Sequence, residues 1–214
     1  MWTAAILAGG QARRLGGLDK RALAVGGAAT IIDRQLAALR DLTPHILIVT
    51  RRVAPEQAAL EQGLAEHGLP GTRSVIDHVT DSGALGGLYT ALTEAPTEQV
   101  LVLACDMPFI TARFLEHLAA LGADPAYDAV IPRDAAGRHP LCASYRRQAA
   151  PALRARIDQR RLRVLDALDD LAVRDLGPDE LHDYDPDGRL LLNVNTPEDY
   201  ARAQESERTA KRYH

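Results

Sequence analysis

Cysteine and lysine are scarce in this chain of 214 residues. The two cysteines, Cys105 and Cys142, form no C-x-x-C motif. They cannot by themselves build a disulfide framework or a zinc site, so we expect a protein of the reducing cytoplasm. The only two lysines are Lys20 and Lys211, and arginine supplies nearly all the other positive charge.

Long apolar runs and an excess of positive charge are also missing. No run approaches the roughly 18–20 apolar residues that span a membrane, so we expect no membrane association. The first residues carry neither a basic region nor a cleavage signal, and no targeting segment is expected. The net charge of −4 excludes a nucleic-acid binder that works by bulk charge. Any anionic ligand would therefore be held by a local cluster of cations.

Strand and helix patterns alternate over the first two thirds of the chain. Short apolar runs predict strands over residues 3–7, 45–49, 74–76, 100–104 and 129–132. Helical spacing predicts helices over 30–42, 54–66, 84–94 and 111–121, the last with Thr111 as its N-cap. This alternation predicts an α/β fold: a three-layer, Rossmann-like, mostly parallel sheet with helices on both faces.

The last third is less regular. Residues 148–171 are expected to be helical in two pieces, and residues 190–194 to form a strand. A closing helix is predicted over 197–204, capped by Thr196. We expect a single domain over residues 1–205, followed by a flexible tail over 206–214.

A glycine-rich basic stretch, LAGGQARRLGGLDK, follows the first predicted strand at residues 7–20. Ligands of parallel α/β sheets bind beyond the carboxyl ends of the strands, and Gly9 and Gly10 let the main chain approach a ligand closely. Arg14 and Lys20 add positive charge, and a lysine suits a point contact to phosphate. The glycine spacing excludes both a Walker A loop and a G-x-G-x-x-G motif. A merely solvated basic loop is the alternative that the glycines alone leave open.

A carboxylate follows the predicted strand 100–104. Asp106 lies in the sequence CDMP, at the carboxyl end of that strand. Such a carboxylate can coordinate Mg²⁺, which takes one or two carboxylates and completes its shell with water and substrate phosphates. The alternative is an aspartate that only caps a turn.

These motifs resemble those of the MobA family of molybdenum cofactor guanylyltransferases. The stretch 7–20 resembles the family signature, with Leu15 where methionine is usual, and CDMP resembles the family's C-D-x-P. The sequence NVNTPED at residues 193–199 resembles N-x-N-T-P-E-[DE], and the His139-Pro140 pair resembles a weaker HP element. Asp77 and the following loop resemble the family's aspartate and G-P-L-x-G loop, with Ala84 in place of the proline. Asp81 is the other aspartate that could match.

The resemblance implies a nucleotide-diphospho-sugar transferase-like fold and transfer of GMP from GTP to molybdopterin, with release of pyrophosphate. It implies a nucleotide site, a pterin site and catalytic residues. The nucleotide would lie against Leu7, Ala8, Gly9, Gly10, Lys20, Asp77 and Asp106. The pterin would lie against His139, Asn193 and Asn195. The catalytic residues would be Arg14, Lys20 and Asp106, and Asp106 would also hold Mg²⁺. Molybdoenzyme chaperones and other cofactor-biosynthesis proteins are further candidate partners. Because successive residues of an extended chain alternate sides, we expect Asn193 and Asn195 to face one pocket.

Other functions fit the same motifs. The chain could be a cytidylyltransferase for the pterin, or a nucleotidyltransferase that acts on a sugar phosphate. It could also be a non-catalytic carrier of the nucleotide or pterin, with the arginine-rich stretch 146–163 as a docking face. Asp106 discriminates the carrier from the enzymes, because a carrier needs no Mg²⁺. Binding of GTP, CTP and ATP would separate the alternative transferases.

Overall fold

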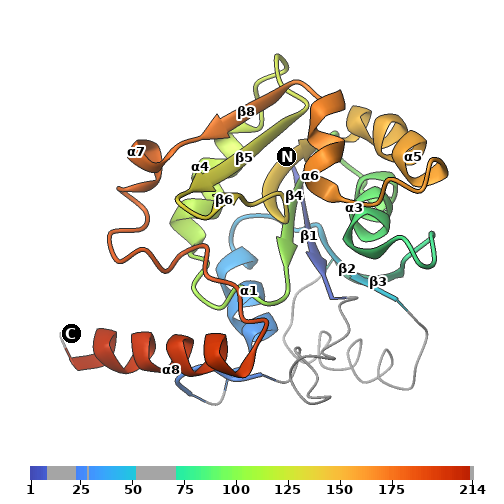
Figure 1. The fold of residues 1–214 in the computed structure, drawn as a ribbon. Coiled ribbons are helices and arrows are strands. Elements are labelled where there is room, and N and C mark those ends of the chain that lie inside the picture. The colour runs from blue at the N-terminus through green and yellow to red at the C-terminus, as the bar shows by residue number, and fades with distance from the viewer. Residues whose placement is uncertain (9–22, 28, 52–70, 213–214) are drawn as a thin grey trace.

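Four parallel strands form one half of the sheet in the computed structural model, which describes residues 1–8, 23–27, 29–51 and 71–212. They are β1 (Thr3–Leu7), β2 (Ile46–Thr50), β3 (Thr72–Ile76) and β4 (Gln99–Ala104), in the order β3-β2-β1-β4 (Figure 1). Each lies where a strand is predicted, within two residues. Their carboxyl ends therefore meet at one edge of the sheet, where a ligand is expected.

The other half of the sheet is mixed. β7 (Cys142–Arg146) lies antiparallel between β4 and β5 (Ala129–Asp134), while β6 (Gly137–Arg138) and β8 (Val173–Leu176) also pair with β5. The prediction of a mostly parallel sheet is confirmed, and so is the strand at β5. The sequence gives no sign of β6, β7 or β8, since each is short or lacks a long apolar run.

Helices cover both faces of the sheet, as predicted (Figure 1). On one face α1 (Ile31–Leu39), α4 (Ala112–Leu121) and α7 (Pro178–Leu181) pack against side chains such as Ile48 and Leu101. On the other, α3 (Gly83–Glu94), α5 (Ala150–Asp158) and α6 (Val164–Ala167) pack against neighbours such as Leu47 and Val102. Two short 3₁₀ helices are also present, η3 (Arg147–Ala149) and η4 (Leu168–Asp170). The central strands are continuous apolar runs because both of their faces are buried.

Side-chain caps begin two of these helices, and one of the caps was predicted. The Thr111 hydroxyl accepts a hydrogen bond from the backbone N–H of Phe114 at 3.3 Å, as predicted for α4. At α1, Thr30 and Asp33 form a reciprocal capping box. The predicted helix over 54–66 lies outside the described residues.

The C-terminal third departs from the prediction in two ways. The strand over 190–194 is wrong: this segment is irregular, and its apolar side chains reflect burial of Leu190, Leu191 and Val194 rather than strand pairing. The helix end at residue 204 is also wrong, because α8 (Pro197–Arg212) takes in residues 206–212, which were expected to form a tail. An ion pair between Arg34 and Glu207, 3.1 Å long, ties this extension to α1. Figure 1 shows α8 lying across the end of the molecule next to α1.

No helix within the described part of the chain combines the length and the apolar character of a membrane span.

Candidate active site

A cleft lies at the carboxyl ends of the four parallel strands. It encloses about 610 Å³ of space, part of which is open to solvent. Its lining comes from the ends of β1, β2, β3 and β4, from the first turns of α3 and from the residue before β7: Leu7, Val49, Thr50, Arg51, Asp77, Gly83, Ala84, Gly87, Ala104, Cys105, Asp106 and Leu141. Three of the predicted nucleotide-site residues, Leu7, Asp77 and Asp106, are thus brought together. We call this the strand-end cleft.

The segment after β1 is described only to Ala8. The Ala8 N–H donates to the Val49 carbonyl at 2.8 Å, and the Ala8 side chain packs against the core on the α1 side rather than lining the cleft. The predicted residues Gly9, Gly10, Arg14 and Lys20 lie outside the described residues.

Asp77 is held in one orientation at the wall of the strand-end cleft. Its Oδ1 accepts hydrogen bonds from the Val79 N–H and from the Thr90 hydroxyl, both at 3.0 Å. Thr90 is fully buried on α3 and also accepts a hydrogen bond from the His78 N–H at 3.0 Å. These bonds leave the second carboxylate oxygen, Oδ2, as the one that can meet a ligand.

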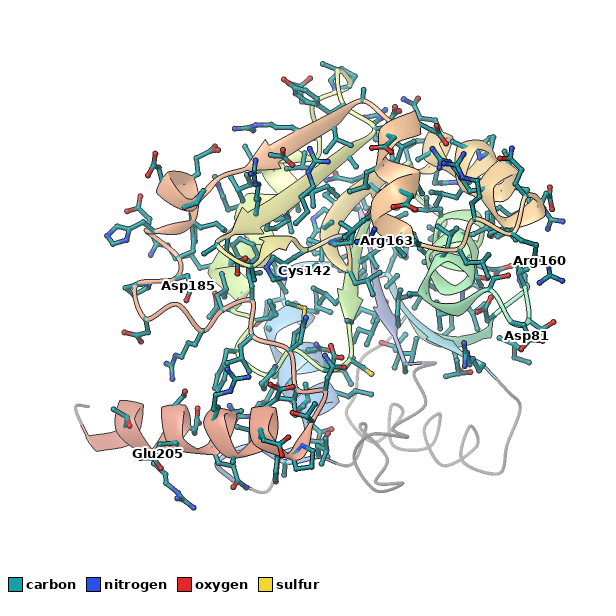
Figure 2. The ribbon with its side chains drawn as sticks, in the orientation of Figure 1. Asp81, Cys142, Arg160, Arg163, Asp185 and Glu205 are labelled. Carbon is teal, nitrogen blue, oxygen red and sulfur yellow. The ribbon has the colours of Figure 1, made fainter. Side chains whose placement is uncertain are left out.

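Asp81, the other aspartate considered from the sequence, is not part of this wall. It lies in the turn before α3, at the margin of the molecule, with a φ of 61° (Figure 2). Of the two aspartates, Asp77 is therefore the one that the fold places at the cleft.

Asp106 follows β4 and is half-buried where two clefts meet. The loop around it is tied down from both sides. Gln35 of α1 is buried, and its Nε2 donates to the Ala104 carbonyl at 2.8 Å and to the Met107 carbonyl at 3.2 Å. The Val194 N–H donates to the Asp106 carbonyl at 2.8 Å. The backbone that carries the Asp106 carboxylate is thus fixed by residues far away in the sequence.

The second cleft, which we call the acceptor cleft, lies beyond Asp106. It holds about 590 Å³ of space and shares Ala104, Asp106 and Leu141 with the strand-end cleft. Its other lining residues are Met107, Arg138, His139, Pro140, Cys142, Asn193 and Asn195. All three residues predicted to lie near a pterin, His139, Asn193 and Asn195, line this one cleft.

Asn193 and Asn195 face the same cleft, as predicted, although their segment is not a strand. Val194 between them is fully buried, in a small core with Leu23 and Ala203. Alternation along an extended chain is enough to turn the two amides to the opposite side.

The start of α8 holds this asparagine segment in place. Asp199 Oδ2 accepts hydrogen bonds from the backbone N–H groups of Asn195, at 3.1 Å, and Thr196, at 3.0 Å, while Thr196 caps the helix as predicted. Burial opposes ionisation of Asp199, but hydrogen bonds from Arg202 and from these backbone groups lower the pKa of its carboxyl.

His139 sits in a turn that buried neighbours hold in place. Its Nε2 lies 2.9 Å from Asp134 Oδ1, and its side chain is only 14% exposed. The Tyr145 hydroxyl donates to the Pro140 carbonyl at 2.7 Å, and burial raises the pKa of Tyr145. Burial also raises the pKa of Cys142 to about 12, so this thiol stays protonated at neutral pH and is a poor metal ligand.

Sequence reasoning missed Gln35 and Thr90 at this site and assigned no role to Arg138. Gln35 interrupts the apolar stripe of α1, and Thr90 lies in a helix that is otherwise apolar at its buried positions. A polar residue at a buried helical position was the available signal, because a buried polar group needs a partner. Arg138 belongs to a strand of two residues, which leaves no periodic pattern to read.

Comparison with known proteins places this chain in a family. Residues 4–172 match the family model of the MobA-like NTP transferase domain. The chain is 38% identical over 207 residues to a probable molybdenum cofactor guanylyltransferase of Chloroflexus aggregans, covering 93% of this chain and 91% of that protein. It is 34% identical over 208 residues to one of Natronomonas pharaonis, covering 95% of this chain and 96% of that protein.

Solved structures agree with the fold. The crystal structure of molybdopterin-guanine dinucleotide biosynthesis protein A from Archaeoglobus fulgidus superimposes with a TM-score of 0.79 at 28% identity, covering 98% of this chain and 100% of that chain. A 4-diphosphocytidyl-2C-methyl-D-erythritol synthase from Anaerococcus prevotii, at 14% identity, superimposes with a TM-score of 0.68 over 97% of this chain and 96% of that chain. The predicted nucleotide-diphospho-sugar transferase-like fold is thereby confirmed.

Proposed function

This chain belongs to the MobA-like NTP transferase family, and from that premise we propose that it is a molybdenum cofactor guanylyltransferase. It transfers GMP from GTP to the terminal phosphate of molybdopterin. The observation that carries this function is the meeting of two clefts at Asp106. One cleft accepts a nucleotide and the other its acceptor, so that the reacting groups come together beside one carboxylate.

The reaction needs little covalent chemistry from the protein. A phosphate oxygen of the acceptor forms a bond to the α-phosphorus of GTP, and the bond from that phosphorus to the bridging oxygen breaks, so pyrophosphate leaves with the electron pair. The attacking phosphate is already an anion, and no general base is required. Catalysis then consists of positioning and of neutralising the charge that grows on pyrophosphate.

The strand-end cleft holds GTP in this proposal. Leu7 and the first turns of α3 pack against the nucleotide, and Asp77 accepts hydrogen bonds from it through Oδ2. The phosphate contacts are assigned from the sequence resemblance to Gly9, Gly10, Arg14 and Lys20, which follow Ala8 and lie outside the described residues. Backbone N–H groups of glycines can bind phosphate oxygens, and the two cations would offset the phosphate charge.

Asp106 fits a Mg²⁺ ion. Its carboxylate provides the hard oxygen ligand that Mg²⁺ prefers, at the point that both substrates share. When bound, Mg²⁺ neutralises phosphate oxygens and orients the leaving group. The tether of Gln35 to the loop keeps the Asp106 carboxylate at this position.

The acceptor cleft holds the pterin. Asn193 and Asn195 each offer one amide acceptor and one amide donor group, which suits the mixed hydrogen-bonding edge of a pterin. His139 lines the same cleft from the turn between β6 and β7.

In the carrier alternative, the arginine-rich stretch 146–163 is the candidate docking face. Much of its charge is already paired within the chain. Arg154 lies 3.0 Å from Asp158, Arg163 lies 3.5 Å from Asp166, and the buried Arg156 forms a two-point ion pair with Asp170. These pairs weaken the case for a carrier that docks through this stretch.

The test is reconstitution of the purified protein with molybdopterin, Mg²⁺ and either GTP, CTP or ATP. We expect a pterin guanine dinucleotide and pyrophosphate from GTP alone. Lys20→Ala should lower turnover by at least about 10²-fold, as when one preorganised donor is lost. Asp106→Asn should abolish Mg²⁺-dependent turnover. A cytosine dinucleotide, or full turnover by Asp106→Asn, would overturn the proposal.

A further inference from the structure

Arg138 is a cation of the acceptor cleft to which no motif assigns a role. It lies on β6, directly before His139, and its side chain is 37% exposed. Its Nε donates to Asp175 Oδ1 at 2.7 Å and its Nη2 donates to Asp175 Oδ2 at 2.8 Å. Asp175 thus holds the guanidinium in a two-point, side-on ion pair.

This ion pair fixes the guanidinium without using all of its donors. A guanidinium has donors on three nitrogens, and the pair with Asp175 occupies Nε and one N–H of Nη2. β6 and β8, which carry the two residues, both pair with β5, so the backbones on both sides are anchored. A guanidinium that is fixed beforehand loses less side-chain entropy when a ligand binds.

The charge balance of the acceptor cleft favours a role for this residue. A phosphate monoester carries a charge of about −1.5 to −2 at neutral pH. Asp106 adds a negative charge to the same cleft. Among the described residues that line it, Arg138 is the only lysine or arginine, whereas His139 lies beside the carboxylate of Asp134.

We propose that Arg138 binds the phosphate of the acceptor through the N–H groups that Asp175 leaves unused, and that Asp175 is the positioning residue for Arg138. This inference rests on the proposed function, because the acceptor is the phosphate-bearing substrate of that reaction. A planar guanidinium suits phosphate because it can form two parallel hydrogen bonds to two phosphate oxygens.

The test is steady-state kinetics of GMP transfer with each substrate varied in turn. Arg138→Gln should raise the KM for molybdopterin by about tenfold or more, the loss expected for a hydrogen bond to a charged group, and leave the KM for GTP unchanged. Arg138→Lys keeps the charge without the planar fork and should recover part of the affinity. Asp175→Asn should raise the KM for molybdopterin by a smaller factor, again without changing the KM for GTP.

A matched control is available one residue away. Arg174 also lies on β8 and forms an ion pair with Glu180 at 2.7 Å, but it does not line the acceptor cleft. Arg174→Gln should leave both KM values within about twofold, as expected for an exposed pair. Thermal unfolding of each variant shows whether it is folded, and Arg138→Lys serves if Arg138→Gln is not.

The outcomes separate the two proposals. If the wild-type protein transfers GMP and Arg138→Gln keeps a normal KM for molybdopterin, the role of Arg138 is refuted and the proposed function stands. If Arg138→Gln raises the KM values for GTP and molybdopterin equally, the residue is structural and the inference fails. If the wild-type protein transfers no GMP, both proposals fail.

Discussion

Gln35 offers the sharpest test of how the fold controls Asp106. Replacing Gln35 with leucine keeps the shape of a side chain that is 1% exposed but removes the amide that donates to the Ala104 and Met107 carbonyls. Each lost hydrogen bond costs about 0.5–1.5 kcal/mol. Gln35 Oε1 is itself buried with no hydrogen-bond partner among the residues that the structure describes, so its removal offsets part of that loss. Two such bonds give about 1–3 kcal/mol, and with the offset we expect the free energy of unfolding to fall by about 1–2 kcal/mol.

The functional cost of Gln35→Leu should exceed what this loss of stability explains. Without the amide, the loop that carries Asp106 is no longer fixed to α1, and a displacement of about 1 Å at a reacting centre can cost about 10²-fold in rate. We expect kcat for GMP transfer to fall by at least about tenfold at a temperature where the variant is fully folded. The assays are urea unfolding followed by circular dichroism, and pyrophosphate release at saturating substrates.

Gln99 provides a matched control. Gln99 is the first residue of β4, so it lies at the end of the strand away from Asp106. Like Gln35, Gln99 is buried, with 8% of its surface exposed. Its Nε2 likewise makes two hydrogen bonds, to the Ala119 carbonyl at 2.6 Å and the Ser144 hydroxyl at 3.0 Å. Gln99→Leu should lose a similar free energy of unfolding but keep kcat. If Gln35→Leu also keeps its kcat, or if both variants lose kcat equally, the positioning role of Gln35 is refuted.

Three further predictions concern other named contacts. Thr90→Val removes the hydroxyl that orients Asp77, and should raise the KM for GTP by about tenfold with little change in the KM for molybdopterin; equal changes would contradict it. Arg160 has a φ of 60° just after α5, a conformation that favours glycine, so Arg160→Gly should stabilise the fold by about 0.5 kcal/mol in urea unfolding, whereas Arg160→Ala should not. The pKa of Asp199 is lower in the folded state than its ordinary value of 3.8, so its stabilising contribution is complete above that pH and is lost as the pH falls through the lowered value. Melting temperatures measured from pH 6 to about pH 2 should therefore fall more steeply for the wild type than for Asp199→Asn, and parallel curves would contradict this.

Local signals in the sequence were sufficient for the parallel half of the fold. Runs such as HILIV and VLVLA are apolar throughout because the strands they form are buried on both faces, and that burial depends little on which strand lies next to which. The caps at Thr111 and Thr196 are local in the same sense, since a hydroxyl and an N–H only a few residues apart decide them. The position of Asp106 at a strand end follows from the run before it.

Only the tertiary structure decided which elements lie next to one another and which distant segments are in contact. β7 inserts antiparallel between β4 and β5, a choice of neighbours that no periodicity encodes. The leucines and the valine over 190–194 indicate that the segment is buried, but not that it pairs as a strand. The prediction of a strand there was wrong for that reason. Likewise, the ion pair of Arg138 with Asp175 and the hydrogen bonds of Gln35 join residues 37 and about 70 positions apart. Such contacts depend on how the packed layers bring distant chain segments together. That packing is determined by the whole sequence and not by the residues next to Gln35 or Arg138.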